Sequence, residues 1–218
     1  MRQAMQFPST IPIFALPNVV LFPGVPLPLH IFEPRYRDMV RDAIDSSAII
    51  GMALLRGDWQ RRYEERPDIY EVGCAGKLVN ADPLPDGKYN ILLHGLREFT
   101  ITRHRFDKTY REAEISWEPS DAQPLAPETR GALVEQITRY VSAAPSSGAA
   151  RLLRDKSLTD AMLVNFFAYA LELDPLEKQA LLQTASLPLR AQRLTECLDF
   201  HLEEARINVS LPESDRCH

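Results

Sequence analysis

Cysteine is scarce in this sequence, which contains three among 218 residues. Cys74, Cys197 and Cys217 lie far apart and lack the short paired spacing of a structural zinc site. An odd and scattered set also cannot form a disulfide framework. We therefore interpret the three as reduced thiols of a cytoplasmic protein and predict no metal site.

Long apolar runs and a positive charge excess are missing as well. The longest apolar run, around Ile49–Leu55, is much shorter than the roughly 20 apolar residues of a membrane-spanning helix. Residues 1–10 lack the apolar core of a signal peptide. The net charge is −5, whereas nucleic-acid-binding domains generally carry a basic stripe. We expect no membrane partner, and the charge argues against a nucleic-acid partner.

Catalytic motifs are absent too. The sequence has no G-x-x-x-x-G-K-[ST] phosphate-binding loop, and the nearest string, Gly73–Lys77, has the wrong spacing. His30 and Glu33 are not accompanied by further metal ligands at a suitable spacing. We interpret Glu33 instead as a helix cap that pairs with Arg35 or Arg37. The prediction is a protein without catalytic, cofactor-binding or metal-binding residues, and not an enzyme.

The composition changes near Pro119. Before this residue, short alternating apolar runs are separated by proline, glycine and aspartate, which is typical of strands. After it, the apolar residues follow a helical spacing. We predict a β-rich subdomain at 10–118, a helical subdomain at 119–206 and a disordered tail at 207–218.

An edge strand and a helix follow each other in the β-rich part. Aliphatic residues alternate with Pro26 and Pro28, and each proline removes a backbone donor, so this strand is expected at a sheet edge or beside a bulge. An i, i+3, i+4 apolar stripe then begins at Tyr36, with Pro34 suited to the first helical position. The stripe predicts a helix that exposes its arginines to solvent.

Turn and cap signals mark other boundaries. Pro85-Asp86-Gly87 predicts a hairpin turn, and the polar stretch Arg56–Arg66 predicts a solvated loop in which Trp59 is exposed. Ser157 and Asp174 each begin a pattern that resembles a helix capping box.

Five blocks of sequence together resemble a known family. They are Ile13–Gly24, Pro26–Tyr36, Tyr70–Gly76, Leu84–Ile91 and Leu93–Phe99. In order and spacing they resemble the LON substrate-binding domain, the N-terminal domain of ATP-dependent Lon proteases. The resemblance implies an α+β fold, with a PUA-like antiparallel β pseudo-barrel that has an inserted helix, followed by a C-terminal α-helical bundle.

The resemblance also implies a function. In full-length Lon this region looks like the part that captures substrates, whereas the ATPase and protease lie in domains that this sequence lacks. The expected function is that of a stand-alone, non-catalytic module that binds unfolded or exposed-apolar protein segments. An adaptor role, a protease partner and self-association stay open. The alternatives are a small-molecule-binding or hydrolytic protein with a pocket between barrel and bundle, and RNA binding through the PUA-like fold.

The expected partner surface combines the edge strand with the helix that follows it. Its predicted residues are Pro26, Pro28, Phe32, Arg35 and Arg37. Apolar strand positions and outward arginines together predict a rigid platform rimmed by charge. The alternative is that Phe32 is part of the core and that the arginines only solvate the helix.

Overall fold

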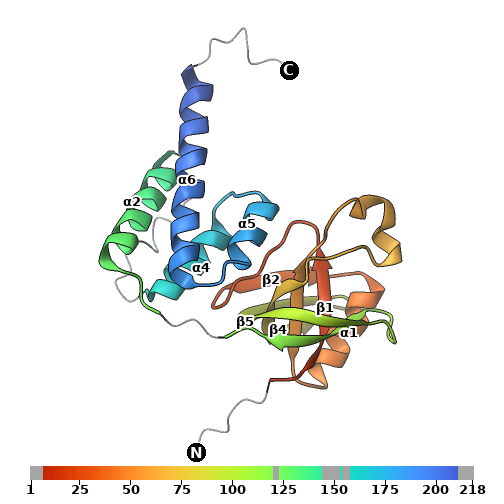
Figure 1. Ribbon diagram of the computed structural model, residues 1–218. Helices are drawn as coiled ribbons and strands as arrows, with labels where there is room; N and C mark the ends of the chain where they lie inside the picture. Colours follow the sequence, from red (N-terminus) through yellow and green to blue (C-terminus); the bar gives the residue numbers. More distant parts are fainter. Residues whose placement is uncertain (1–6, 120–122, 144–152, 154–157, 211–218) are drawn as a thin grey trace, which may run out of the picture. The chain divides into compact units, whose positions relative to one another are not determined.

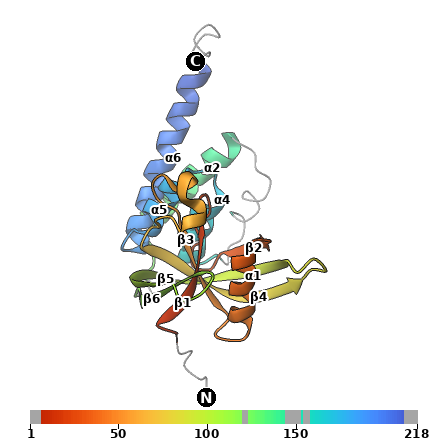
Figure 2. The ribbon, with the colours of Figure 1, turned by 90° about the vertical axis from the view of Figure 1, so that its right-hand side faces the viewer.

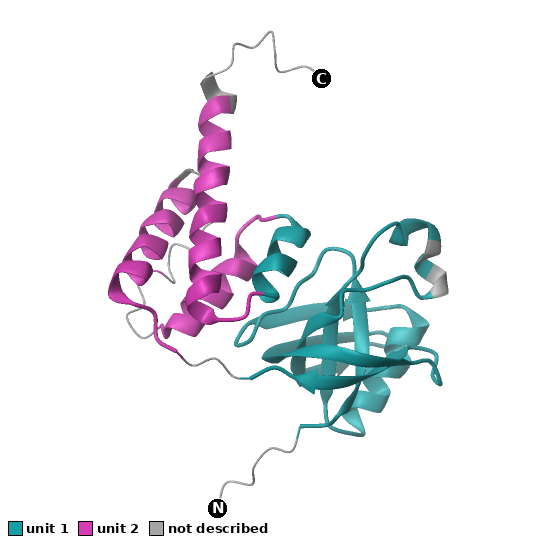
Figure 3. Cartoon of the chain, in the orientation of Figure 1, with its two compact units in different colours: residues 1–120, 174–183 teal, residues 121–173, 184–218 magenta. Residues whose placement is uncertain are grey.

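The computed structural model describes residues 7–119, 123–143, 153 and 158–210. The chain divides into two compact units (Figure 3). The first contains residues 1–120 and 174–183, and the second contains residues 121–173 and 184–218. The sequence, in contrast, predicts residues 174–183 to belong to the helical subdomain, because they lie between other helices along the chain. The subdomain boundaries 10–118 and 119–206 stay a prediction.

The first unit is built on a six-stranded sheet with the order β2-β5-β4-β3-β1-β6 (Figure 1). The strands are β1 (Thr10–Leu16), β2 (Pro26–Ile31), β3 (Ile49–Leu54), β4 (Val72–Pro83), β5 (Tyr89–Arg105) and β6 (Arg111–Trp117). The first half of β5 pairs with β2, and its second half pairs with β6. Because β6 also pairs with β1, the sheet closes on itself.

One strand pairing differs from the expected antiparallel arrangement. β1 and β3 are parallel, with Ile13 opposite Gly51. Two parallel neighbours need a long crossover connection, and here β2 and helix α1 (Pro34–Ile44) lie between them in the chain. The expectation of an all-antiparallel barrel was therefore wrong, while the α+β class is confirmed.

The inside of the closed sheet is a tightly packed apolar core. Its aliphatic and aromatic side chains include Ile11, Ile13, Ala53, Leu55, Phe99, Ile101 and Ile115. Gly51 lies among them, and a Cβ there would come within 2.8 Å of Ile11 and Ile13 and 2.9 Å of Phe99. Every residue of β3 is buried, so this strand is covered on both faces.

Helix α1 begins at Pro34 as predicted and buries the stripe that starts with Tyr36. The Tyr36 ring packs on Phe14 at 4.2 Å between centroids, and its hydroxyl donates to Ala15 O at 3.2 Å. The predicted turn at Pro85–Gly87 joins β4 and β5, and Gly87 has a φ of 77°. This hairpin extends outward from the sheet (Figure 2).

The stretch predicted as a solvated loop is more ordered than expected. Residues Trp59–Glu65 form a 3-10 helix, η1. Trp59 and Tyr63 pack against the core cluster and against each other, with ring centroids 6.1 Å apart. Trp59 is partly buried and not fully exposed, because packing of its ring removes apolar area from water.

The second unit consists of α2 (Pro127–Ala143), α4 (Asp160–Ala170) and α6 (Leu187–Ser210), and α2 and α4 both pack on α6. The N-cap residue of α4 is Thr159, whose side chain accepts a hydrogen bond from Met162 N. Ser157, where the sequence predicts a capping box, lies outside the described residues. In the first unit, α5 (Pro175–Leu182) has the capping box predicted at Asp174.

Helix α6 continues through Ser210, so the first four residues of the expected tail are helical, and 211–218 lie outside the described residues. Among the described residues, no helix is long and apolar enough to cross a membrane.

Candidate binding surface and cavity

Strand β2 exposes one face and buries the other. Pro26, Pro28 and His30 are exposed, whereas Leu27 and Ile31 are buried. The alternation follows from the period of two along a strand. The exposed face of β2 is thus rich in proline.

The neighbouring strand β5 extends this face. Leu92 is directly opposite Pro28, and Asn90 is directly opposite His30. Residues that are opposite each other in an antiparallel pair share a face of the sheet. A 2.8 Å hydrogen bond joins His30 Nδ1 to Asn90 Oδ1, and on β4 the Asn80 amide donates to Asp82 at 2.8 Å. The face therefore has an apolar stripe bordered by polar groups.

Phe32 follows β2 directly and is 58% exposed. Its ring stacks near His30, with 6.3 Å between the centroids. The alternative that Phe32 is a core residue was wrong. We name the exposed Pro26, Pro28 and Phe32 together with the half-buried Leu92 the β2 face.

Arg35 does not join the β2 face. Its side chain is 20% exposed and forms a 2.8 Å ion pair with Glu33. Glu33 also accepts a 2.7 Å hydrogen bond from Tyr63 on η1. The prediction that Glu33 pairs with an arginine is confirmed, but its side chain makes no cap hydrogen bond. The expectation that Arg35 points to solvent was wrong, because Glu33 supplies a carboxylate partner for it and Tyr63 of η1 supplies a ring and a backbone carbonyl.

The Arg37 side chain lies apart from both the β2 face and Arg35. One of its terminal nitrogens lies 2.8 Å from the position of a Cβ built on Gly87, so the guanidinium rests on the β4–β5 turn. Positions 35 and 37 are two residues apart on a helix and so cannot face the same side. The predicted set therefore divides into the exposed β2 face, Arg35 beside Tyr63, and Arg37 beside Gly87.

Arg35 borders a cavity of about 250 Å³ in the first unit. Its floor is the end of the sheet's core, formed by Ile13, Ala15 and Leu55. Arg35 contributes to one wall together with Tyr36 and Tyr63, whose rings lie 4.7 and 4.8 Å from its guanidinium carbon.

Two further arginines, Arg66 and Arg111, line the same cavity. Arg66 has a φ of 63°, which is rare for a residue with a side chain, and donates to the carbonyls of Phe106 and Lys108 at 3.3 and 2.6 Å. Arg111 is half-buried and donates to Pro67 O at 2.7 Å. Burial lowers the pKa of Arg111, and the charge of Arg66 acts in the same direction.

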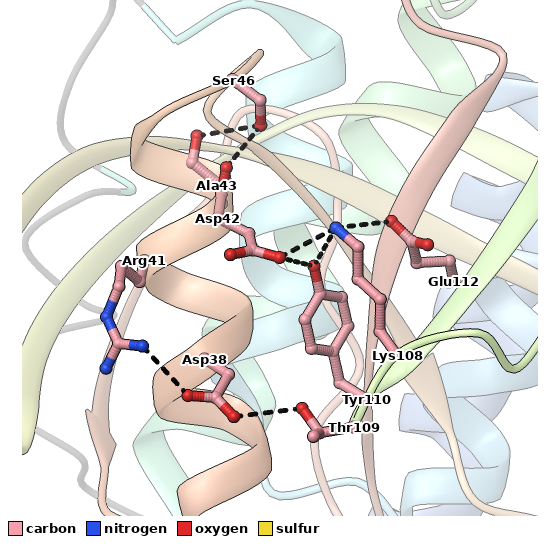
Figure 4. A network of polar contacts seen from close by, with 9 residues as sticks. All are labelled: Asp38, Arg41, Asp42, Ala43, Ser46, Lys108, Thr109, Tyr110 and Glu112. Atoms are coloured by element: carbon pink, nitrogen blue, oxygen red, sulfur yellow. Dashed lines mark hydrogen bonds and ion pairs between the residues drawn. The ribbon is translucent and has the colours of Figure 1, made fainter.

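A polar network fixes the side of the cavity that carries Tyr110 (Figure 4). The Tyr110 hydroxyl donates to Asp42 on α1 at 2.6 Å, and Lys108 donates to the same carboxylate at 2.8 Å. Burial and the hydrogen bond to Asp42 raise the pKa of Tyr110 to about 12. The hydroxyl therefore stays protonated as a donor at neutral pH.

Sequence reasoning did not find this cavity. Its arginines and tyrosines come from α1, from η1 and the residue after it, from the β5–β6 turn and from the start of β6, which are far apart in the sequence. No short motif contains them. Tyr36 was the one cavity residue that the sequence indicated, since the apolar stripe of the helix predicts that it is buried.

The arrangement can be compared with known proteins. A family model for the ATP-dependent protease La (LON) substrate-binding domain matches residues 10–199. The chain belongs to this family. The predicted resemblance is therefore confirmed, and with it the relationship to the Lon proteases.

Curated relatives of this LON-domain chain are Lon proteases. It is 24% identical over 217 residues to the Lon protease of Flavobacterium johnsoniae, covering 97% of this chain and 26% of that protein. It is 27% identical over 208 residues to the Lon protease of Anaeromyxobacter dehalogenans, covering 92% and 24%. The chain thus spans about a quarter of the length of the relatives it matches.

Solved structures show the same fold. The Lon N-terminal domain protein from Xanthomonas campestris is 28% identical, with a TM-score of 0.64, and the match covers 85% of this chain and 96% of that one. The N-terminal domain of Mycobacterium avium complex Lon protease has a TM-score of 0.67 at 17% identity, covering 88% and 99%. The LON-domain part of Lon is not its catalytic part.

Proposed function

We propose that this LON-domain chain is a non-catalytic module that binds unfolded or exposed-apolar protein segments through the β2 face. The observation that carries the proposal is the exposure of Pro26, Pro28 and Phe32 next to one another in a member of a substrate-binding family. Exposed apolar groups bordered by polar ones are typical of protein interaction sites.

The rigidity of this face supports its role. Prolines hold φ near one value, so β2 loses little conformational entropy when a partner binds. Phe32 supplies a large apolar area with few rotatable bonds, as binding residues often do. Contacts of this kind depend on apolar surface and not on one partner sequence, which suits the capture of unfolded chains.

The finer parts of the proposal follow the family. We include in it a PUA-like form of the closed sheet, a helical bundle formed by the second unit, and a cytoplasmic location. Captured chains would be passed to a protease, with this module acting as an adaptor. Pure protein is then expected to bind casein without degrading it and without hydrolysing ATP, since the sequence contains no phosphate-binding loop. Proteolysis that survives repurification would contradict this.

The direct test replaces Phe32 by serine and measures binding to reduced, carboxymethylated α-lactalbumin, which is permanently unfolded. We expect about a tenfold or larger loss of affinity, as for an aromatic residue at the centre of an interface. The matched control is Phe200→Ser, because Phe200 has 60% exposure against 58% for Phe32 but lies on α6. An equal loss in both variants, or none in Phe32→Ser at native stability, would remove the β2 face from consideration.

A further inference from the structure

Three arginines, Arg35, Arg66 and Arg111, line the cavity. Glu33 pairs with Arg35. The ion pairs found among the described side chains include neither Arg66 nor Arg111, whose hydrogen bonds go to the neutral backbone carbonyls of Phe106, Lys108 and Pro67. Each guanidinium has five N–H donors, so both arginines keep donors beyond these bonds. Asp68 and Glu71 act on Arg111 through space, but neither makes an ion pair or hydrogen bond with it in the described part of the chain, so both arginines keep donors for a ligand.

Both cations lie against the ring of Phe106, and the charge of Arg66 acts on Arg111. The guanidinium carbons of Arg66 and Arg111 lie 5.0 and 5.8 Å from the centre of the same Phe106 ring. Two like charges near each other repel, and partial burial strengthens the repulsion. An anion between them would relieve it and would receive charge-assisted hydrogen bonds from both.

Apart from Thr109, the rest of the lining is apolar or aromatic. Ile13, Ala15 and Leu55 form the floor, and Tyr36 forms part of a wall. The volume of about 250 Å³ is below the roughly 300–1,000 Å³ of pockets for drug-sized ligands. One residue-sized group fits such a space. A plain inorganic anion would leave the apolar floor without contacts.

We propose that this cavity binds a carboxylate attached to an apolar group, with the carboxylate on Arg66 and Arg111 and the apolar part against Ile13 and Leu55. Two sources offer this chemistry, namely the C-terminal residue of a polypeptide and a free small organic acid. The polypeptide source rests on the proposed function, because it would let the module hold one end of a captured chain. The small-acid source does not depend on it.

The test measures binding of four probes to the full chain by calorimetry. The probes are a short peptide that ends in leucine with a free carboxylate, the same peptide amidated at its end, isocaproate, and inorganic phosphate. We expect amidation to weaken binding about tenfold or more, since it removes charge-assisted hydrogen bonds. Salt at about 0.5 M should weaken the remaining interaction by screening.

Two variants test whether the probes bind in the cavity. Arg111→Gln removes one cation and should abolish the preference for the free carboxylate. Ala15→Leu fills the floor and leaves both arginines in place, so it tests the cavity even if Arg111→Gln folds poorly. Phe200→Ser is the control, because Phe200 is exposed on α6 and lines neither the cavity nor the β2 face, and it should bind the probes as the wild type does.

Each outcome decides the question. Binding of the free peptide alone, of isocaproate alone or of both, lost in Ala15→Leu, supports the carboxylate site and identifies its source. Equal binding of free and amidated peptides, phosphate binding as tight as isocaproate binding, or no binding of any probe overturns it. Failure of the proposed function is distinguishable, because it appears as lack of binding to unfolded α-lactalbumin and leaves the isocaproate result unchanged.

Discussion

The ammonium group of Lys108 lies 2.8 Å from a carboxylate oxygen of Asp42, although 66 positions separate them in the sequence. This contact joins the β5–β6 turn to helix α1 (Figure 4). Tyr110 donates to the same oxygen. The three groups therefore hold one side of the arginine-lined cavity in place.

The Asp42 carboxylate gives the first unit a specific dependence on pH. Hydrogen bonds from Lys108 and Tyr110 hold the pKa of Asp42 below its ordinary value. A lowered folded-state pKa stabilises the fold above the unfolded-state pKa of about 3.9, and the stability is lost as the pH falls through the folded value. We expect Asp42→Asn to lower the free energy of unfolding by about 0.5 kcal/mol at neutral pH, a value reduced for solvent screening.

The measurement is urea denaturation of wild type and Asp42→Asn from neutral pH to about pH 3, just below the ordinary aspartate pKa. The difference between the two proteins should shrink toward the acid end. Asp45→Asn is a suitable control, since Asp45 is exposed on the turn that ends α1. A constant difference across the range would show that Asp42 does not act through its charge.

Gly51 is expected to tolerate no side chain. A methyl group there would come within 3 Å of Ile11, Ile13 and Phe99, and overpacking of a close-packed core typically costs about 1–3 kcal/mol. Gly51→Ala should lower the free energy of unfolding by this amount in chemical denaturation. Gly131→Ala in helix α2 is the contrasting variant, because no atom lies within 4 Å of its Cβ position. Gly131→Ala should stabilise its helix by about 1 kcal/mol. If both variants are destabilised, overpacking is not the cause of the loss in Gly51→Ala.

A buried polar pair stabilises the second unit. Arg190 on α6 is 6% exposed and donates to the side-chain oxygen of Asn165 on α4 at 2.7 Å. Asn165→Ala leaves this donor without its partner and should cost about 1–3 kcal/mol. A double-mutant cycle with Arg190→Met measures the coupling. We expect the double variant to lose less than the sum of the single losses, and strict additivity would contradict a direct interaction.

The sequence predicts local elements better than it predicts the site. Pro34, the stripe from Tyr36 and the capping box at Asp174 depend on neighbours within a few residues, and each is confirmed. The direction of Arg35 depends on Glu33 and on Tyr63, which is 28 positions away. A periodic pattern contains no information about such a partner.

The same limit applies to the sheet and to the cavity. The prolines of β2 predict an edge strand, and β2 lies at the end of the strand order. The parallel pairing of β1 with β3 depends on how the chain crosses over, which alternation alone cannot indicate. Arg66 and Arg111 come together only after the β5–β6 turn has folded back toward the end of η1. Their juxtaposition is a tertiary property without a local signature.

The two prolines of β2 are expected to keep the chain from associating through its open edge. Gly95 N donates to Val25 O at 2.9 Å, and backbone groups of an antiparallel strand alternate in direction. The backbone of Pro26 and Pro28 therefore faces the open side, where a proline offers no N–H. Exposed edges with free donors recruit other strands, and proline is a common protection.

Replacement of both prolines by valine restores two donors at that edge. We expect Pro26→Val with Pro28→Val to form dimers or larger species, measured by light scattering across a concentration series, while the wild-type edge does not pair. His30→Val is the matched control, because it adds an apolar side chain on the same exposed face without adding a backbone donor. Association of the control to the same extent would assign the effect to apolar surface, and association of neither variant would show that the prolines do not protect the edge.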